Sequence, residues 1–478
     1  MSSTAVQQDD RTVIARPMSQ DAYRILLLRN DGAELLVVGE RPPFALPCVE
    51  IPRWDRVAEN VTAAVRKHYG LSAICLFTPE LSVTTTDADR PLYQVMETRE
   101  ARIAAPGETH WLLLHSIADQ FFADEQDLVA VTDMLRQISE FRKGEASGPF
   151  GRPGWIQELT SWVQHEVQPY GFRLSGEFRQ LNASPTFALL RLQTNGPALW
   201  FKAVGEPNRR EFPVSVALSR LFPGFVPDVI ATHSTWNGWL TTEFPGSTLD
   251  QVRDACAWKR AAQTLAELQI ASLGNTDQLL GAGCRNLRTA TLLRLVDPFI
   301  DVMSQLMERQ HKTPPPALGK EEMQELGRQV KDALTAWAQS NIPDTLGHLD
   351  LNPGNILASP DQCVFLDWAE AYVGPPFLTF QYLIEHLSQT KQQGLIGSQL
   401  LVDHYFSNWL GCVSRVAVTS GQRLMPLLAV FACATASDWS EALLSRDERF
   451  LGYLRSLTRR MQREASVFNA NRMHAGCA

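Results

Sequence analysis

The chain has 478 residues and a formal net charge of −8 at pH 7. That length favours two or three domains, and an acidic balance without any run of Lys or Arg excludes nucleic acid as a main partner. No segment approaches 18 uninterrupted apolar residues, so we expect no membrane partner and a cytoplasmic location. The eight cysteines form no CxxC pair, which argues against a disulfide framework and a zinc ribbon.

The first part of the chain, residues 1–142, reads as an α+β domain. Residues 55–71 repeat apolar side chains at helical spacing, with Val57, Val61 and Val65 on one face. Five β-branched and aromatic stretches read as strands: YRILLLRN, ELLVVGE, AICLFTPEL, PLYQVMET and HWLLLHSI. The segment KGEASGPFGRPG, rich in Gly and Pro, then predicts a linker at residues 143–154.

A second region, residues 155–248, is predicted to be a small β-rich lobe. GEFRQLN, TFALLRLQ and ALWFKAVG read as strands, with Asn195 and Gly196 as a hairpin turn. From residue 249 to residue 478 the apolar spacing is helical almost throughout. A β-rich lobe followed by a larger helical lobe predicts a ligand cleft between them.

A cluster of polar residues falls in the helical lobe, in LGHLDLNPGNIL and, shortly after it, VFLDW. His348, Asp350 and Asn355 lie in a loop interrupted by Pro and Gly, and Asp367 closes a short strand. A hairpin joining the two segments would bring two carboxylates and a carboxamide together. Such oxygen donors suit Mg²⁺ shared with phosphate better than zinc. The pattern predicts phosphoryl transfer, in which a carboxylate takes the proton of the attacking hydroxyl.

Phosphoryl transfer also needs a cation on the nucleotide phosphates, and Lys202 can supply it. This lysine lies in ALWFKAVG, in the middle of a strand, where a charge among apolar neighbours needs a partner. Glu211 begins the next helical stretch and is the expected partner. Glu206 is the alternative, although Pro207 directly after it disfavours a helical position.

HLDLNPGN followed by FLDW resembles the catalytic and metal-binding signatures of the aminoglycoside phosphotransferase and choline kinase family, with a likeness that extends over about residues 171–381. The resemblance implies a bilobal protein-kinase-like fold, so that the fold class of the whole chain is α+β. It also implies that Asp350 is the catalytic base and that Asn355 and Asp367 hold Mg²⁺.

By the same resemblance, Lys202 contacts the phosphates of ATP, with GTP as the alternative nucleotide, and Glu211 orients the lysine. LNASPTFALL resembles the loop over the phosphates, although it has none of the glycines of the protein-kinase loop. WLTTEFPGSTLD resembles the segment that links the lobes and meets the adenine. The further nucleotide contacts implied are Asn182 and Ser184 in the loop, and Thr242, Glu243 and Phe244 in the linking segment.

Two positions depart from the family pattern. Thr379 stands where the family commonly has an Asp that braces the catalytic loop, and Gln269 stands where it often has a His. We therefore expect the loop to be held differently, and Gln269 to affect packing more than chemistry. His348 would support the loop rather than react.

The first domain resembles a Nudix hydrolase in outline, through a strand, a loop and a helix that ends in Tyr-Gly-Leu. The carboxylates of the Nudix box are largely missing, since its positions hold Val49, Asp55, Ala63-Ala64 and Lys67-His68. A positive side chain where a cation must bind predicts no Nudix hydrolase activity. The domain would instead bind a nucleotide-like ligand, dock a protein partner or shape the substrate entrance.

These observations predict an ATP-dependent phosphotransferase that transfers the γ-phosphate to a hydroxyl of a small molecule. For a cationic acceptor, the candidate contacts in the helical lobe are Glu370, Asp438 and Glu441. The alternative is a pseudokinase or nucleotide-sensing regulatory protein, which Thr379, the glycine-poor loop and the altered Nudix box favour. The sequence leaves the identity of the acceptor and the oligomeric state open.

Overall fold

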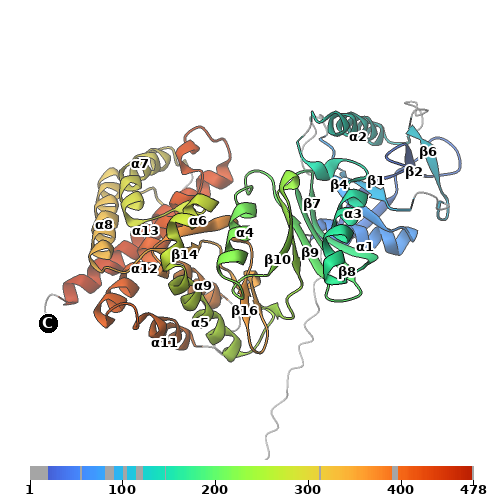
Figure 1. The fold of residues 1–478 in the computed structure, drawn as a ribbon. Coiled ribbons are helices and arrows are strands. Elements are labelled where there is room, and N and C mark those ends of the chain that lie inside the picture. Colours follow the sequence, from blue (N-terminus) through green and yellow to red (C-terminus); the bar gives the residue numbers. More distant parts are fainter. Residues whose placement is uncertain are drawn as a thin grey trace, which may run out of the picture. The chain divides into compact units, whose positions relative to one another are not determined.

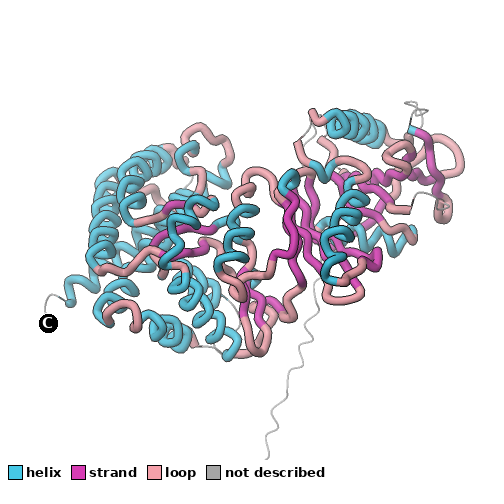
Figure 2. Tube along the Cα trace, in the orientation of Figure 1, coloured by secondary structure: helices cyan, strands magenta, loops and turns pink. Residues whose placement is uncertain are grey.

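A computed structural model describes residues 20–53, 56–80, 91–100, 105–114, 122–145, 147–311, 314–389 and 397–475. The chain folds into two compact units: unit 1 comprises Met1–Gly205 and His233–Leu240, and unit 2 comprises Glu206–Thr232 and Thr241–Ala478. Strands dominate the first unit and helices the second (Figure 2). The predicted mixed α+β class is confirmed, and the predicted domain boundaries inside unit 1 stay predictions.

Unit 1 begins with a six-stranded sheet of order β4-β5-β1-β2-β6, in which β3 also pairs with β1. All five predicted strands are present, and β3 is an addition. The strands are β1 (Gln20–Arg29), β2 (Glu34–Val38), β3 (Cys48–Pro52), β4 (Ala73–Phe77), β5 (Leu92–Thr98) and β6 (Thr109–Leu113).

Two helices cover this sheet from opposite sides (Figure 1). The predicted helix is α1 (Val57–Tyr69), which packs Val61 and Val65 against Ile25 and Leu27 of β1. Because side chains alternate along a strand, the intervening residues of β1 face the other way, toward α2 (Glu125–Lys143). Asp55, one position of the Nudix box, lies outside the described residues, and the Nudix resemblance stays a prediction.

The predicted linker packs against the first domain in the part that the structure describes. It holds the 3-10 turn η3 (Pro149–Gly151) and leads into α3 (Trp155–Val167). Phe150 is buried, and a Cβ at Gly151 would lie 2.4 Å from the ring of Phe141 in α2. The N–H of Gly154 donates to the buried carboxylate of Glu97 (2.8 Å), so residues 150–154 of the segment are anchored.

The second sheet has the order β10-β11-β9-β8-β7, and the boundary between the units runs through β10 and β11. Asn195 and Gly196 lie in the connection between β8 and β9, as predicted. The strands are β7 (Leu174–Ser184), β8 (Phe187–Thr194), β9 (Leu199–Ala203), β10 (Val229–His233) and β11 (Gly238–Thr242).

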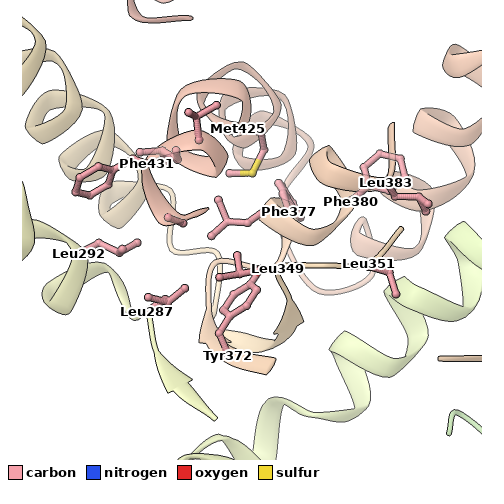
Figure 3. Packing of buried hydrophobic residues seen from close by; sticks show 14 of the residues in the cluster. Leu287, Leu292, Leu349, Leu351, Tyr372, Phe377, Phe380, Leu383, Met425 and Phe431 are labelled. Atoms are coloured by element: carbon pink, nitrogen blue, oxygen red, sulfur yellow. The ribbon is translucent and has the colours of Figure 1, made fainter. Parts of the chain in front are cut away.

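Unit 2 is built on one large hydrophobic core, part of which Figure 3 shows. Its helices are α4 (Glu211–Leu221), α5 (Ala255–Ala271), α6 (Thr276–Ala282), α7 (Thr289–Glu308), α8 (Lys320–Gln339), α9 (Phe377–Gln389), α11 (Ser398–Trp409), α12 (Arg415–Ala436) and α13 (Glu448–Ala475). Among the described helices, α12 alone is long and apolar enough to cross a membrane, and 56% of its most apolar window is buried, as in a core helix.

Two small sheets in unit 2 carry the polar motif. One has the order β12-β15-β16 and the other the order β13-β17-β14. Their strands are β12 (Ser247–Thr248), β13 (Arg285–Asn286), β14 (Thr345–His348), β15 (Ile356–Ala358), β16 (Cys363–Phe365) and β17 (Ala371–Gly374). The motif residues therefore lie on the connections between short strands.

Candidate active site

Asp350 lies on the loop between β14 and β15, and its neighbours determine which way it faces. Leu349 and Leu351 are buried in the core of unit 2. Figure 3 shows these two side chains among the other buried apolar residues of this core. Burial of the residues on both sides of Asp350 favours one backbone position for the loop, since moving it would expose two leucines at a cost of about 1.5–3 kcal/mol each.

The carboxylate of Asp350 accepts hydrogen bonds from three side chains. The hydroxyl of Tyr382 in α9 donates to Oδ1 (3.0 Å), and Asn352 Nδ2 donates to the same oxygen (3.3 Å). Asn355 Nδ2 donates to the backbone carbonyl of Asp350 (2.9 Å) and lies 3.5 Å from Oδ2. The predicted base and the first predicted metal ligand are thus in direct contact.

His348 is fully buried and acts as a strut for this loop. Its Nδ1 accepts the backbone N–H of Asp350 (3.0 Å), so its Nε2 carries the proton and donates to the carbonyl of Leu366 (3.0 Å). Burial lowers the pKa of His348, which keeps the ring neutral and able to make both bonds. A neutral ring with a hydrogen bond at each nitrogen agrees with the predicted supporting role of His348.

Thr379, the first departure from the family pattern, holds the loop through its hydroxyl. Its Oγ1 accepts the backbone N–H of His348 (2.8 Å) and lies 3.0 Å from the hydroxyl of Tyr372. Because Tyr372 donates to the carbonyl of Pro375 (2.9 Å), its oxygen is free to accept the Thr379 proton. His348, Thr379 and Tyr372 are fully buried and Pro375 is buried as well, so a neutral hydroxyl holds the loop from within the core.

Gln269, the second departure, has a packing role, as predicted. It is fully buried at the end of α5, where its Nε2 donates to the carbonyl of Pro376 (2.7 Å) and its Oε1 accepts the hydroxyl of Tyr405 (2.5 Å). The carboxamide therefore ties α5 to the segment that precedes α9 and to α11.

Asn355 and Asp367 are brought together by the β15–β16 hairpin. Ile356 pairs with Phe365, and the N–H of Leu366 donates to the carbonyl of Asn355 (2.8 Å). Asp367 follows at once with a left-handed backbone (φ 62°), a conformation that costs a non-glycine residue about 1 kcal/mol or more and is typical of functional sites.

These two oxygen donors fit a magnesium ion. Mg²⁺ in phosphoryl-transfer sites commonly takes one or two protein side chains and completes its shell with phosphate oxygens and water. Among the described residues, no group of three or more His, Cys, Asp or Glu side chains could hold a metal ion without such help. The donor set therefore suits a metal that arrives with a nucleotide.

The predicted adenine segment lies beside the same hairpin. Thr242 ends β11, and Glu243 and Phe244 follow it. A Cβ at Gly246 would lie 2.5 Å from the carbonyl oxygen of Ala358 in β15, so only glycine permits this approach. Ser247 then pairs with Ala358, which fixes the segment against the hairpin that carries Asn355.

Lys202 and Glu211 lie in different units. Lys202, in β9 of unit 1, is half-buried and pairs with Leu189, and its Nζ lies 5.8 Å from the ring centroid of Trp239. Glu211 is the first residue of α4 in unit 2 and is 1% exposed. Helix α4 packs against the turn η8 (Trp368–Glu370), which directly follows Asp367. The pairing of the two residues stays a prediction.

The predicted phosphate loop is the turn between β7 and β8 in unit 1. Ser184 pairs with Phe187, so the turn consists of Pro185 and Thr186, while Asn182 is exposed on the preceding strand. The N–H of Phe150 donates to the carbonyl of Pro185 (3.0 Å). A Cβ at Gly148 would lie 2.1 Å from that oxygen. The loop has no glycine of its own, but a glycine of the linker segment allows the backbone to pack against it.

Strand β7 is also held by the first domain. The side chain of Gln180, 2% exposed, accepts the N–H of Cys75 (2.8 Å) and donates to its carbonyl (3.0 Å), as a neighbouring strand would. Arg179 forms an ion pair with Glu59 of α1. The acidic side chain of α1 is therefore engaged in packing against β7.

The three candidate acceptor carboxylates differ in their surroundings. Glu370 forms an ion pair with Arg285 (3.0 Å), while Asp438 and Glu441 are exposed near the end of α12. An ion pair already compensates the charge of Glu370, which makes it a weaker contact for a cationic acceptor.

Two residues of this region were not predicted from the sequence. Tyr382 follows Thr379 by three positions on α9, so helical geometry places both on the face that meets the loop. That spacing was a usable signal. Gln180 offered none, since nothing in QLNAS indicates which strand its carboxamide will meet.

Comparisons with known proteins agree with the motif. Residues 206–403 match the model of the phosphotransferase enzyme family. The comparison with curated proteins gave no match. Solved structures with a similar fold include macrolide 2'-phosphotransferase MphH from Brachybacterium faecium, at 17% identity over 61% of this chain and 99% of that chain (TM-score 0.38). Ethanolamine kinase of Plasmodium vivax is 15% identical over 64% and 85% (TM-score 0.43), and choline kinase LicA from Streptococcus pneumoniae is 13% identical over 66% and 99% (TM-score 0.41). Residues 206–403 of this chain are thus similar to the phosphotransferase enzyme family.

Proposed function

We propose that this protein transfers the γ-phosphate of ATP to a hydroxyl group of a small molecule. The observation that carries the proposal is the contact of Asp350 with Asn355, beside an Asp367 whose backbone is left-handed. A general base of this reaction is a carboxylate that its neighbours hold in place and that can accept the proton of a hydroxyl.

In this proposal Asp350 orients the acceptor hydroxyl and takes its proton as the oxygen attacks the γ-phosphorus. Asn355 and Asp367 hold Mg²⁺, which when bound neutralises charge on the phosphate oxygens. Lys202 contacts the nucleotide phosphates and Glu211 orients it, while Asn182 and Ser184 donate to the phosphates. The backbone of Thr242, Glu243 and Phe244 receives the adenine.

The surroundings of Glu370 bear on the class of the acceptor. The ion pair with Arg285 already compensates the charge of Glu370, so a neutral hydroxylated acceptor fits the site as well as a cationic one would. Macrolides, ethanolamine and choline are named for the proteins of similar fold. A panel of acceptors for this protein should therefore include glycosides, amino alcohols and neutral polyols.

The test incubates the full chain with ATP, Mg²⁺ and this panel, and follows by mass spectrometry the gain of one phosphate. Asp350→Asn should lower the rate of transfer by about 10²–10⁴-fold, because the amide cannot take the proton. Asp361→Asn, on the exposed turn between β15 and β16, is the matched control and should keep the rate of the parent protein.

Two outcomes would contradict the proposal. Equal rates for Asp350→Asn and the parent protein would remove Asp350 from the reaction. ATP could also raise the thermal unfolding midpoint, which would show that it binds, while the protein neither transfers phosphate to any acceptor nor hydrolyses ATP. That result would favour the nucleotide-sensing alternative.

A further inference from the structure

The hydroxyl of Tyr382 and the carboxylate of Asp350 form a contact that the proposed reaction does not use. Tyr382 donates to Oδ1 of Asp350 at 3.0 Å, closer than the amide of Asn352 at the same oxygen and closer than Asn355 at Oδ2. Among the described residues, Asp350 is the single hydrogen-bond partner of this hydroxyl.

A hydroxyl donor at this distance from a general base has the geometry that the attacking hydroxyl of a substrate needs. The phenol therefore lies where a water molecule or an acceptor hydroxyl would have to bind Oδ1. Oδ1 has two lone pairs, which Tyr382 and Asn352 occupy, so a hydroxyl that approaches Oδ1 has to displace one of these donors.

The inner face of the helix that carries Tyr382 is buried, whereas the side chain of Tyr382 is only partly buried. Phe377, Phe380 and Leu383 bury the inner face of α9, and Thr379 ties it to the loop. The ring of Tyr382 contacts the ring of His386 one turn later, at 4.6 Å between centroids. A rotation of the side chain would release Asp350 while the backbone of α9 stays in place.

The phenol acts as a donor because it keeps its proton. Burial, and then the negative charge of Asp350, raise the pKa of Tyr382. The contact with Asp350 is therefore a hydrogen bond from a neutral hydroxyl to the carboxylate.

We infer that Tyr382 is a positioning residue that occupies Oδ1 of Asp350 until an acceptor hydroxyl replaces it, and so limits the use of water as acceptor. This inference rests on the proposed function. In the limited side reaction, water oxygen bonds to the γ-phosphorus, the bond from that phosphorus to the bridging oxygen breaks, ADP leaves with the electron pair, and a water proton passes to Asp350.

The variant Tyr382→Phe removes the hydroxyl and keeps the ring. Without an acceptor, it should hydrolyse ATP about tenfold faster than the parent protein, because Oδ1 loses its strongest competitor for water. The matched control is Tyr453→Phe, a half-exposed tyrosine whose hydroxyl lies 3.8 Å from Cys433 Sγ. The control should hydrolyse ATP at the parent rate.

A second measurement needs neither nucleotide nor metal. Tyrosines carrying ¹³C at Cζ give one NMR signal each, and the signal lost in Tyr382→Phe belongs to Tyr382. That signal should shift in Asp350→Asn, which exchanges a charged hydrogen-bond acceptor for a neutral one, and should stay in place in Asp361→Asn.

The outcomes separate the two proposals. A parent protein that neither transfers phosphate nor hydrolyses ATP overturns the proposed function and this inference with it. An active parent protein with unchanged or slower hydrolysis in Tyr382→Phe overturns this inference alone. An unmoved Tyr382 signal in Asp350→Asn likewise overturns it, because the contact would then be absent in solution.

Discussion

The loop that carries Asp350 and the β7–β8 hairpin are both predicted to meet the nucleotide, but they are stabilised by different parts of the chain. Asp350 is held by His348, Asn355 and Tyr382, none more than 32 residues away. In the hairpin, Gln180 bonds to Cys75, 105 residues earlier. A motif within one short segment can be read from the sequence, whereas support from a distant part of the chain cannot.

The largest expected effect is a loss of stability in a variant that disturbs the β7–β8 hairpin. Gly148 has φ +104°, and a Cβ there would lie 2.1 Å from the carbonyl oxygen of Pro185. Gly148→Ala should lower the stability of unit 1 by about 3 kcal/mol or more, because backbone strain adds to a backbone clash. Calorimetric unfolding of the full chain measures this effect.

The control for that variant is Gly171→Ala. Gly171 also has a positive φ (+74°), but an added Cβ would meet nothing within 4 Å, so its expected cost is about 1 kcal/mol. Equal losses for the two variants would mean that the contact between the linker segment and the hairpin turn contributes nothing.

An intermediate effect tests the Asp350 loop. Thr379→Val keeps the shape of the side chain but removes the acceptor for the buried N–H of His348. We expect a loss of about 1–3 kcal/mol, the cost of leaving a buried donor unsatisfied. Thr379→Ser should restore most of it. Thr335→Val, on an exposed part of α8, should change little; an equal loss there would contradict the role of Thr379.

The smallest expected effect is the pH dependence of the stability that His348 of the same loop contributes. The pKa of His348 is lowered by burial below the value of the unfolded chain, so its contribution is complete above about pH 6.5 and is lost as the pH falls through the lowered pKa. The unfolding midpoint should therefore fall between pH 7 and pH 5. His348→Asn should show a shallower fall, whereas the exposed control His165→Asn should keep the parent slope.

The sequence was informative where chemistry and structure depend on the same few residues. The spacing of Asp350, Asn355 and Asp367 across one hairpin indicated a phosphotransferase, and the segment that holds them matches the model of that family. Strands and helices followed from periodicity, since each exposes one apolar face to a core. Thr379, by contrast, was expected to change how the loop is held, and only the structure reveals that its hydroxyl accepts the backbone N–H of His348.

Sequence alone thus predicted a reaction class and the residues that would carry it, because those residues are close together in the chain and chemically distinctive. Tertiary structure decided which side chains touch them. Tyr382 meets Asp350 because α9 packs beside the loop, and Gln180 meets Cys75 because β7 lies along β4. Hydrogen bonds act over about 3 Å in space, and the sequence around Gln180 does not indicate which distant residue will lie within that range.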